Sequence, residues 1–170
     1  GMTMHSSAIA GKYGQGVSFD GIDDQLTIAN MDQYDVLSVS LWLKRGRASN
    51  TIDDGLIGCT TSSGWGVGID GFFTSGRPFL TLVGASAAYS NGTLIADTEW
   101  HHLVLTYDGT DARFYLDGLL DATVNYPGVT FDCGGAGYTI GNVNLGTWFL
   151  GILDDVRVYN RAVQDSEVRT

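Results

Sequence analysis

The sequence predicts an all-β fold, an antiparallel β-sandwich of two sheets of the jelly-roll kind. Apolar and polar residues alternate with a period of two over many short segments, as in strands with one buried face. The chain has 24 Gly and only two Pro, and only two of its 19 acidic residues are Glu. Because Asp and Gly favour turns whereas Glu favours helices, these counts indicate short strands joined by many turns.

The expected strands follow one another with turn residues between them. They are residues 17–19, 25–28, 37–44, 55–59, 64–69, 79–83, 100–124, 138–142 and 149–159. The segment 100–124 is expected to form three antiparallel strands, because Asp108-Gly109 and Asp117-Gly118 are strong hairpin signals between apolar runs. The one helical candidate is 161–169, which carries at most a weak apolar stripe.

The length and charge of the chain limit the classes of function. A chain of 170 residues has the length of one domain, so we expect a single domain over residues 1–170, with 1–12 as a loosely ordered tail. The net charge of −10 argues against binding to nucleic acid and to anionic membrane surfaces. No apolar run is long enough for a membrane helix, so no membrane insertion is expected, and no secretory signal pattern is visible at the amino end.

Three further motifs have alternative interpretations. Residues 66–71, GVGIDG, match the dinucleotide fingerprint, but no helical pattern follows them, which favours a Gly-rich strand that another backbone or a ligand approaches closely. His101 and His102 are adjacent in a strand and point to opposite faces, so they do not form a metal pair. The cysteines, Cys59 and Cys133, allow one disulfide or none.

The aromatic residues supply candidates for ligand binding. Trp42 and Trp100 lie inside clear strand patterns and are expected in the core. Trp65 and Trp148 lie beside Gly and polar residues near strand ends, where an aromatic face could stack on a sugar. Asn91-Gly92-Thr93 matches an N-glycosylation acceptor, although a polar loop is the simpler interpretation.

Acidic residues gather at both ends of the chain. Asp20, Asp23 and Asp24 lie between two short strands, and Asp154 and Asp155 lie in the last strand. Carboxylates that converge with backbone carbonyls suit Ca²⁺, a hard cation that prefers oxygen ligands. The alternative is that these aspartates only form turns, for which Asp is a favoured residue.

Six segments in order resemble the laminin-G-like jelly-roll domains of the concanavalin A-like lectin and glucanase superfamily. They are VSFDGIDDQLTI, LSVSLWLK, EWHHLVLTYDG, RFYLDGLL, YTIGN and LGILDDVRVYNRAV. The resemblance implies adjacent first and last strands, which would bring Asp20 and Asp24 near Asp154. It therefore implies a structural calcium ion, with Asp20 and Asp154 as the first choice of ligands and Asp23 and Asp24 as the second. The Glu-x-Asp-x-Glu-type motif that the superfamily's retaining glucanases share is absent from this sequence.

The resemblance implies a non-catalytic carbohydrate-binding or adhesion domain, extracellular or attached to a surface. The partner would be a glycan or a surface protein. The glycan would lie on a concave face or at a loop rim, against the residues Trp65, Arg77, Tyr89, Asn142, Asn144 and Trp148. The alternative is a structural or assembly module of a surface or virion protein without a small ligand. A glycoside-cleaving enzyme with an Asp pair is the third hypothesis.

Overall fold

The computed structural model describes residues 8–28, 33–49, 51–59, 64–72, 76–82, 86–143 and 146–168. Its strands are β1 Ala8–Ala10, β2 Gln15–Asp20, β3 Leu26–Ile28, β4 Leu37–Arg45, β5 Asp54–Gly58, β6 Trp65–Asp70, β7 Arg77–Leu82, β8 Ser86–Tyr89, β9 Trp100–Tyr107, β10 Asp111–Leu116, β11 Leu119–Asn125, β12 Tyr138–Ile140, β13 Asn142–Val143, β14 Thr147–Trp148 and β15 Leu150–Tyr159.

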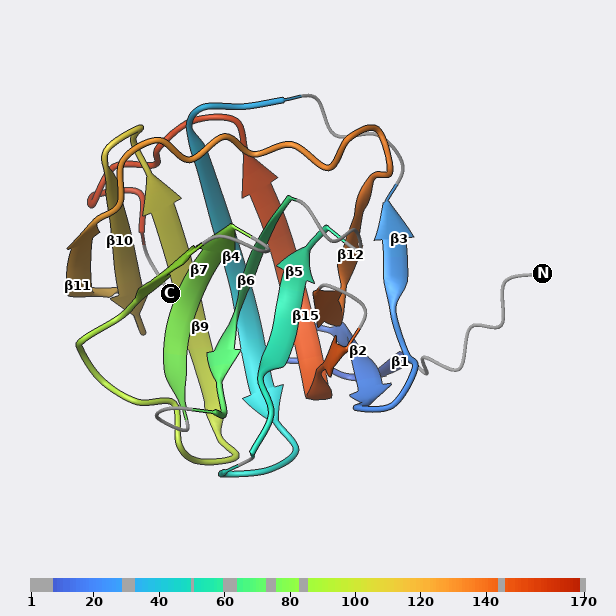
Figure 1. Ribbon diagram of the computed structural model, residues 1–170. Coiled ribbons are helices and arrows are strands. Elements are labelled where there is room, and N and C mark those ends of the chain that lie inside the picture. The colour runs from blue at the N-terminus through green and yellow to red at the C-terminus, as the bar shows by residue number, and fades with distance from the viewer. Residues whose placement is uncertain are drawn as a thin grey trace.

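The strands form two sheets that make a β-sandwich, as predicted. The seven-stranded sheet has the order β1-β2-β15-β4-β9-β10-β11. The eight-stranded sheet has the path β13-β14-β5-β6-β7-β8. Strand β12 pairs with β5 on one side and with β3 on the other. Figure 1 shows β10 and β11 at one side of the sandwich and β3 and β12 at the other.

The meander predicted for residues 100–124 is confirmed. Strands β9, β10 and β11 pair antiparallel in succession. Asp117 and Gly118, the two residues between β10 and β11, have φ angles of 51° and 84°, and positive φ at both central positions is the geometry of a type I′ hairpin turn. At the preceding turn, Asp108 Oδ1 accepts hydrogen bonds from the backbone N–H groups of Thr110 and Asp111.

The core lies between the sheets and follows the alternation of the strands. In β4, Leu37, Leu41 and Leu43 are at most 1% exposed and belong to the core between the sheets. In β6 the glycines have a packing reason, which confirms the predicted Gly-rich strand. A Cβ on Gly66 would lie 2.3 Å from Val143 Cγ1, and one on Gly68 would lie 2.6 Å from Phe79 Cζ.

The first and the last strand, β1 and β15, lie in the seven-stranded sheet. Strand β15 pairs with β2, as the resemblance implied. Strand β1 pairs with β2, so residues 8–10 of the predicted tail are part of a sheet, whereas residues 1–7 lie outside the described residues. The predicted helix at 161–169 is not formed over its described part, since residues 161–168 are irregular with one turn.

The two cysteines form a disulfide, which settles the choice that the sequence left open. Cys59 follows β5, and Cys133 lies in the loop that precedes β12. The bond joins positions 74 residues apart, and both cysteines belong to the main hydrophobic core. Among the described residues, no helix has the length and apolarity that crossing a membrane requires.

Candidate functional site

The candidate site lies on the outer face of the seven-stranded sheet. Because neighbouring residues on a strand point to opposite faces, the residues that alternate with the core leucines of β4 point outward. These include Ser40 and Trp42, which lie opposite Val104 and His102 of β9. The Trp42 and His102 rings stack on this face with their centroids 5.1 Å apart.

The N-terminal segment covers one end of this face. The backbone N–H of Tyr13 donates a hydrogen bond of 2.8 Å to Asp154 Oδ2, and a Cβ on Gly11 would lie only 2.4 Å from that same oxygen. Glycine at position 11 therefore lets the segment reach Asp154. Lys12 Nζ lies 4.4 Å from the Trp42 ring centroid, and the Tyr13 ring meets Trp42 edge-on.

The C-terminal segment, residues 161–168, covers the other end. Ser38 Oγ donates to the carbonyl oxygen of Arg161 and accepts from the backbone N–H of Val163. Tyr115 donates its hydroxyl hydrogen to Asp165 Oδ1 at 2.6 Å. Val163 and Val168 pack against Val104 and Tyr115 in a small apolar cluster outside the main core. These contacts fix the segment on the sheet.

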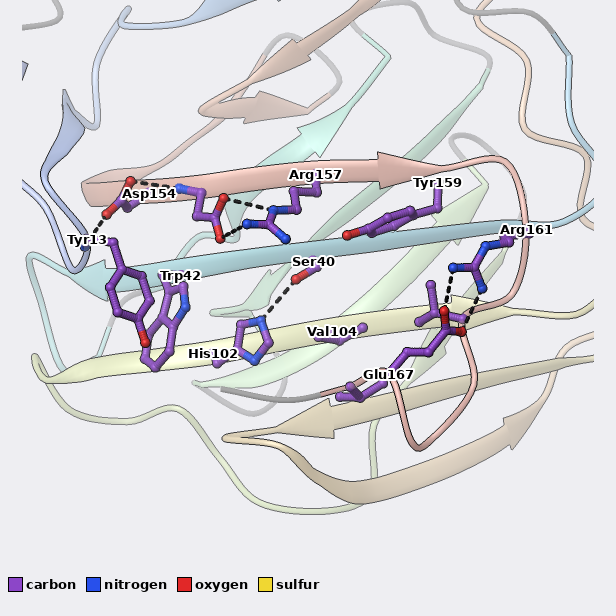
Figure 2. A pocket seen from close by; sticks show the side chains of 13 residues that line it. Tyr13, Ser40, Trp42, His102, Val104, Asp154, Arg157, Tyr159, Arg161 and Glu167 are labelled. Atoms are coloured by element: carbon purple, nitrogen blue, oxygen red, sulfur yellow. Dashed lines mark hydrogen bonds and ion pairs between the residues drawn. The ribbon is translucent and has the colours of Figure 1, made fainter.

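The two segments leave between them a groove of about 550 Å³ that we call the outer groove. It is lined by Tyr13, Ser40, Trp42, His102, Val104, Asp154, Asp155, Arg157, Tyr159, Arg161, Val163, Glu167 and Val168. Figure 2 shows these side chains along β15, β4 and β9, from Tyr13 at one end to Arg161 and Glu167 at the other. The volume is within the range of small-molecule sites, roughly 300–1,000 Å³.

One wall of the groove runs from β15 into the C-terminal segment and consists of two ion pairs and a tyrosine. Arg157 Nη2 lies 2.8 Å from Asp155 Oδ2, and Arg161 makes two bonds, of 2.6 and 2.7 Å, to the Glu167 carboxylate. Tyr159 stands between the two arginines in the chain, and the guanidinium of Arg161 lies 5.8 Å from its ring centroid. The hydrogen bonds from Arg161 lower the pKa of Glu167 to about 2.

The backbone of β15 is irregular at this wall. Its pairing with β4 shifts register between Asp154 and Arg157, and Asp155 has a φ of 47°, which is rare for a residue other than Gly. A bulge re-aims the side chains of a strand, and such features are often found next to binding sites. The bulge sets the positions of the Asp155 and Arg157 side chains in the groove.

The histidines have opposite environments, as the strand geometry predicted. His102 faces the groove, where Ser40 Oγ lies 2.9 Å from its Nε2, and burial lowers its pKa. His101 faces the other way and lies between Asp117 and Asp97, at 2.8 and 3.1 Å. Burial lowers the pKa of His101, but the hydrogen bonds with Asp117 and Asp97 outweigh this effect and raise it.

Two of the predicted ligand residues are buried. Trp65 is fully buried between the sheets, where its ring contacts Phe131 at 5.3 Å, so the expectation that it stacks on a sugar is corrected. It alternates with Val67 and Ile69, and all three point inward. Asn142 is also fully buried, with its Nδ2 donating to Gln25 Oε1.

The remaining predicted ligand residues do not belong to the outer groove. Arg77 and Tyr89 lie together on the eight-stranded sheet, with the guanidinium 4.4 Å from the ring centroid, and Arg77 pairs with Asp70 at 2.9 Å. Trp148 is half-buried in β14. Asn144 lies outside the described residues. The loop rim at Arg77, Tyr89 and Trp148 stays a prediction.

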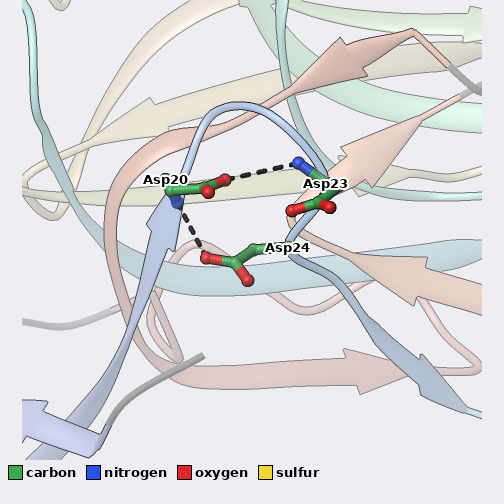
Figure 3. A group of neighbouring side chains, drawn as sticks. All are labelled: Asp20, Asp23 and Asp24. Atoms are coloured by element: carbon green, nitrogen blue, oxygen red, sulfur yellow. Dashed lines mark hydrogen bonds between the residues drawn. The ribbon is translucent and has the colours of Figure 1, made fainter. Parts of the chain in front are cut away.

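The three aspartates between β2 and β3 form one cluster. Each of Asp20, Asp23 and Asp24 offers an oxygen within 4.8 Å of the others (Figure 3). Asp20 Oδ1 accepts from the backbone N–H groups of Ile22 and Asp23, and Asp24 Oδ2 accepts from that of Asp20. The cluster therefore closes a turn, which is one of the two roles that the sequence left open.

The same cluster fits a calcium ion. Because Ca–O distances are about 2.4 Å, two ligands of one ion lie no more than about 5 Å apart, and these oxygens meet that limit. Asp24 is 6% exposed, and its Oδ1 is buried without a hydrogen-bond partner. A buried carboxylate oxygen without a partner is unfavourable unless something binds it.

Asp154 does not join this cluster. In the ladder between β2 and β15, Leu150 lies opposite Asp20 and Leu153 opposite Val17. Asp154 therefore lies four residues from the partner of Asp20, or about 13 Å along the strands. The predicted adjacency of the end strands is correct, but the predicted calcium set with Asp154 is not formed, because the register places Asp154 at the outer groove.

Sequence reasoning missed most of the outer groove. Its residues come from two chain ends, β4, β9 and β15, and no local motif joins them. Trp42 is 6% exposed, as expected for a core residue, but it lies on the outer face under Tyr13 and Lys12. Trp100 is only half-buried and lies opposite Lys44 on the same face. The signal that could have indicated the groove is the set of β4 residues that alternate with the core leucines, such as Ser40 and Trp42, because they point to the outer face.

Two antiparallel sheets with paired end strands and an aromatic, polar groove on an outer face define a lectin-like β-sandwich domain. The chain belongs to the Laminin_G_3 family of the concanavalin A-like lectin/glucanases superfamily, whose model matches residues 11–169. A search of curated proteins finds no match.

Several solved structures share the fold at low sequence identity. Domain 4 of AbnA, a GH43 extracellular arabinanase from Geobacillus stearothermophilus in complex with arabinotriose, has a TM-score of 0.76 and 20% identity, with 99% of this chain and 80% of that chain covered. The binding domain of Paraclostridial Mosquitocidal Protein 1 has a TM-score of 0.73 and 14% identity, with 96% and 44% covered. A SAP-like pentraxin from Limulus polyphemus has a TM-score of 0.68 and 19% identity, with 90% and 79% covered. This chain thus spans less than half of the toxin chain.

Proposed function

We propose that this chain is a non-catalytic carbohydrate-binding domain and that its glycan lies in the outer groove. The observation that carries the proposal is the combination of aromatic rings and planar polar groups on one hollowed face. Tyr13 is 57% exposed, and the side chains of Arg157 and Arg161 are 57% and 50% exposed. Aromatic faces pack on the apolar faces of sugar rings, and fixed planar groups hydrogen-bond to their hydroxyls.

The similar structures support a binding role. Domain 4 of AbnA is in complex with arabinotriose, and a botulinum neurotoxin binding domain is in complex with a sialylated ligand. We also propose an extracellular or surface location. The disulfide between Cys59 and Cys133 supports it, since disulfides persist in oxidising compartments, and the AbnA arabinanase is itself extracellular.

The state of the groove carboxylates supports a role without catalysis. A glycosidase needs one carboxyl group that keeps its proton as a general acid. Glu167 and Asp155 are paired with arginines, and Asp154 accepts hydrogen bonds from the N–H groups of Tyr13 and Asp155. Outside the groove, burial raises the pKa of Asp53, whose Oδ1 accepts a hydrogen bond from the backbone N–H of Gly71.

We further propose that Asp20, Asp23 and Asp24 hold a structural calcium ion. When bound, the ion would supply positive charge to these three carboxylates and a partner for Asp24 Oδ1. The three side chains would hold the turn between β2 and β3. Thermal unfolding with calcium added back after EDTA tests this role, and at about 100 times Kd the gain is about 2.7 kcal/mol, or roughly 8 °C in a domain of this size. Asp24→Asn should abolish the gain and Asp154→Asn should keep it.

Isothermal titration calorimetry with a panel of oligosaccharides tests the binding function. We expect Tyr13→Ala and Tyr159→Ala to weaken binding about fivefold or more, since stacking on a sugar contributes roughly 1–3 kcal/mol. Tyr89→Ala and Trp148→Ala are matched controls that remove an aromatic ring from the predicted loop rim. Loss of binding only in these controls would move the site to the rim, and a folded protein that binds no glycan would contradict the proposed function.

A protein-binding role is the second candidate. Strand β11 ends the seven-stranded sheet, and Leu119 and Leu120 on it are 74% and 52% exposed. Exposed apolar side chains on an edge strand are typical of surfaces that meet another chain. One similar neurotoxin binding domain is in complex with rat synaptotagmin II. A stable oligomer that is lost in Leu119→Ser would favour this role.

A further inference from the structure

We infer that the outer groove selects neutral glycans over anionic ones, and that Glu167 and Asp155 determine this selectivity by neutralising Arg161 and Arg157. The inference rests on the proposed function, since it names the class of glycan that the same groove takes.

The two arginines of the groove are already paired with carboxylates. Arginine recognises the carboxylate of an acidic sugar through two parallel N–H donors. In Arg161 these donors, Nη1 and Nη2, are bonded to Oε2 and Oε1 of Glu167 at 2.7 and 2.6 Å. In Arg157, Nε and Nη2 are bonded to the Asp155 carboxylate, both at 2.8 Å. An anionic sugar would have to displace a carboxylate that the protein itself supplies.

The charged groups around the groove nearly balance one another. Three carboxylates, Asp154, Asp155 and Glu167, line it with two arginines, and Lys12 lies over Trp42 at its edge. The groove is therefore close to neutral, whereas the whole chain has a net charge of −10. The negative charge of the whole chain repels anionic sugars as they approach, whereas a neutral sugar is unaffected by it.

The paired arginines and carboxylates can still bind sugar hydroxyls. The side chains of Arg157 and Asp155 are 57% and 37% exposed, and those of Arg161 and Glu167 are 50% and 42% exposed. Carboxylate oxygens have further lone pairs and guanidinium groups have further N–H donors, so each pair can accept from and donate to a sugar hydroxyl. Tyr159 lies between the two pairs in sequence and offers a ring for stacking.

The test compares neutral and anionic trisaccharides by calorimetry with the full chain. The neutral probes are arabinotriose, xylotriose and maltotriose, and the anionic probes are trigalacturonate and sialyllactose. We expect the wild type to bind a neutral probe with an affinity that changes less than twofold between 50 and 500 mM NaCl, and to bind the anionic probes at least tenfold more weakly. In Glu167→Gln, which keeps an oxygen for the backbone N–H of Gln164, binding of an anionic probe should rise roughly three- to tenfold.

A matched control removes the same charge elsewhere. Asp108→Asn releases Arg113 from an ion pair of 2.6 Å outside the groove, so it should leave the binding of both classes unchanged. Tighter binding of an anionic probe by the wild type, or no gain in Glu167→Gln, would overturn the inference and leave the proposed function standing. If no probe of either class binds any folded variant, the proposed function fails, and the inference fails with it.

Discussion

The disulfide gives a prediction whose size follows from the structure. Cys59 and Cys133 close a loop of 74 residues, and the loss of entropy in the unfolded chain then corresponds to about 4.5 kcal/mol of stability at 25 °C. With an unfolding entropy of about 2.1 cal/mol/K per residue, a chain of 170 residues should lose about 12 °C in Tm when the bond is removed. Oxidised wild type and protein refolded after reduction differ only in the bond, so scanning calorimetry of the two isolates its effect.

Two results would refute this reasoning. The double variant Cys59→Ala/Cys133→Ala should be no more than a few degrees less stable than the single variant Cys59→Ala, since either change breaks the same bond. A much larger loss in the double variant would mean that packing around the sulfur atoms, rather than the loop closure, carries the effect. A difference below about 4 °C between the oxidised and the reduced wild type would mean that the unfolded chain is already restricted without the bond.

Three more predictions follow from charged and polar contacts. In an NMR titration, the pKa of His101 should lie above the ordinary value for histidine and that of His102 below it, and equal pKa values would contradict both assignments. The contribution of His101 to stability is therefore complete below the unfolded pKa and is lost as the pH rises through the folded pKa. The contribution of His102 is present above the unfolded pKa and is lost as the pH falls below it. Asp54→Asn removes the carboxylate paired with Arg45 in a pair that is fully buried on both sides, and it should cost about 3–5 kcal/mol, or roughly 8–14 °C in Tm, with Asp108→Asn as the exposed control. Tyr115→Phe removes the bond to Asp165 and should cost about 1 kcal/mol while raising hydrogen exchange in residues 161–168, and unchanged exchange there would show that the bond does not hold the segment.

The parts of the fold that depend on neighbouring residues could be predicted from the sequence. The meander was predictable because Asp117-Gly118 supplies the two positive φ angles that its turn needs. The opposite faces of His101 and His102 followed from strand geometry alone, and they lie opposite Leu43 and Trp42 as that geometry requires.

The errors arise where a position depends on distant parts of the chain. Trp65 has glycine on both sides, which suggested an exposed rim, but these glycines exist because Val143 and the Cys59 side chain press against the backbone there. For Asp154 the pairing of the end strands was predictable, whereas the register was not. Asp154 lies four residues beyond the partner of Asp20 in the ladder, which places it at the groove and not at the aspartate cluster. The sequence contains no local signal that sets this register.

The alternation of apolar and polar residues in β4 and β9 predicts part of the outer groove. Ser40, Trp42, His102 and Val104 face outward because Val39, Leu41, Leu103 and Leu105 are needed in the core. The pattern that predicts the core therefore also predicts which residues of β4 and β9 can form the floor of a site. It does not predict what covers that floor, because Tyr13 and residues 161–168 reach it through contacts with Asp154, Ser38 and Tyr115. Each of these contacts joins residues at least 50 positions apart, so the walls of the groove become visible only in the folded chain.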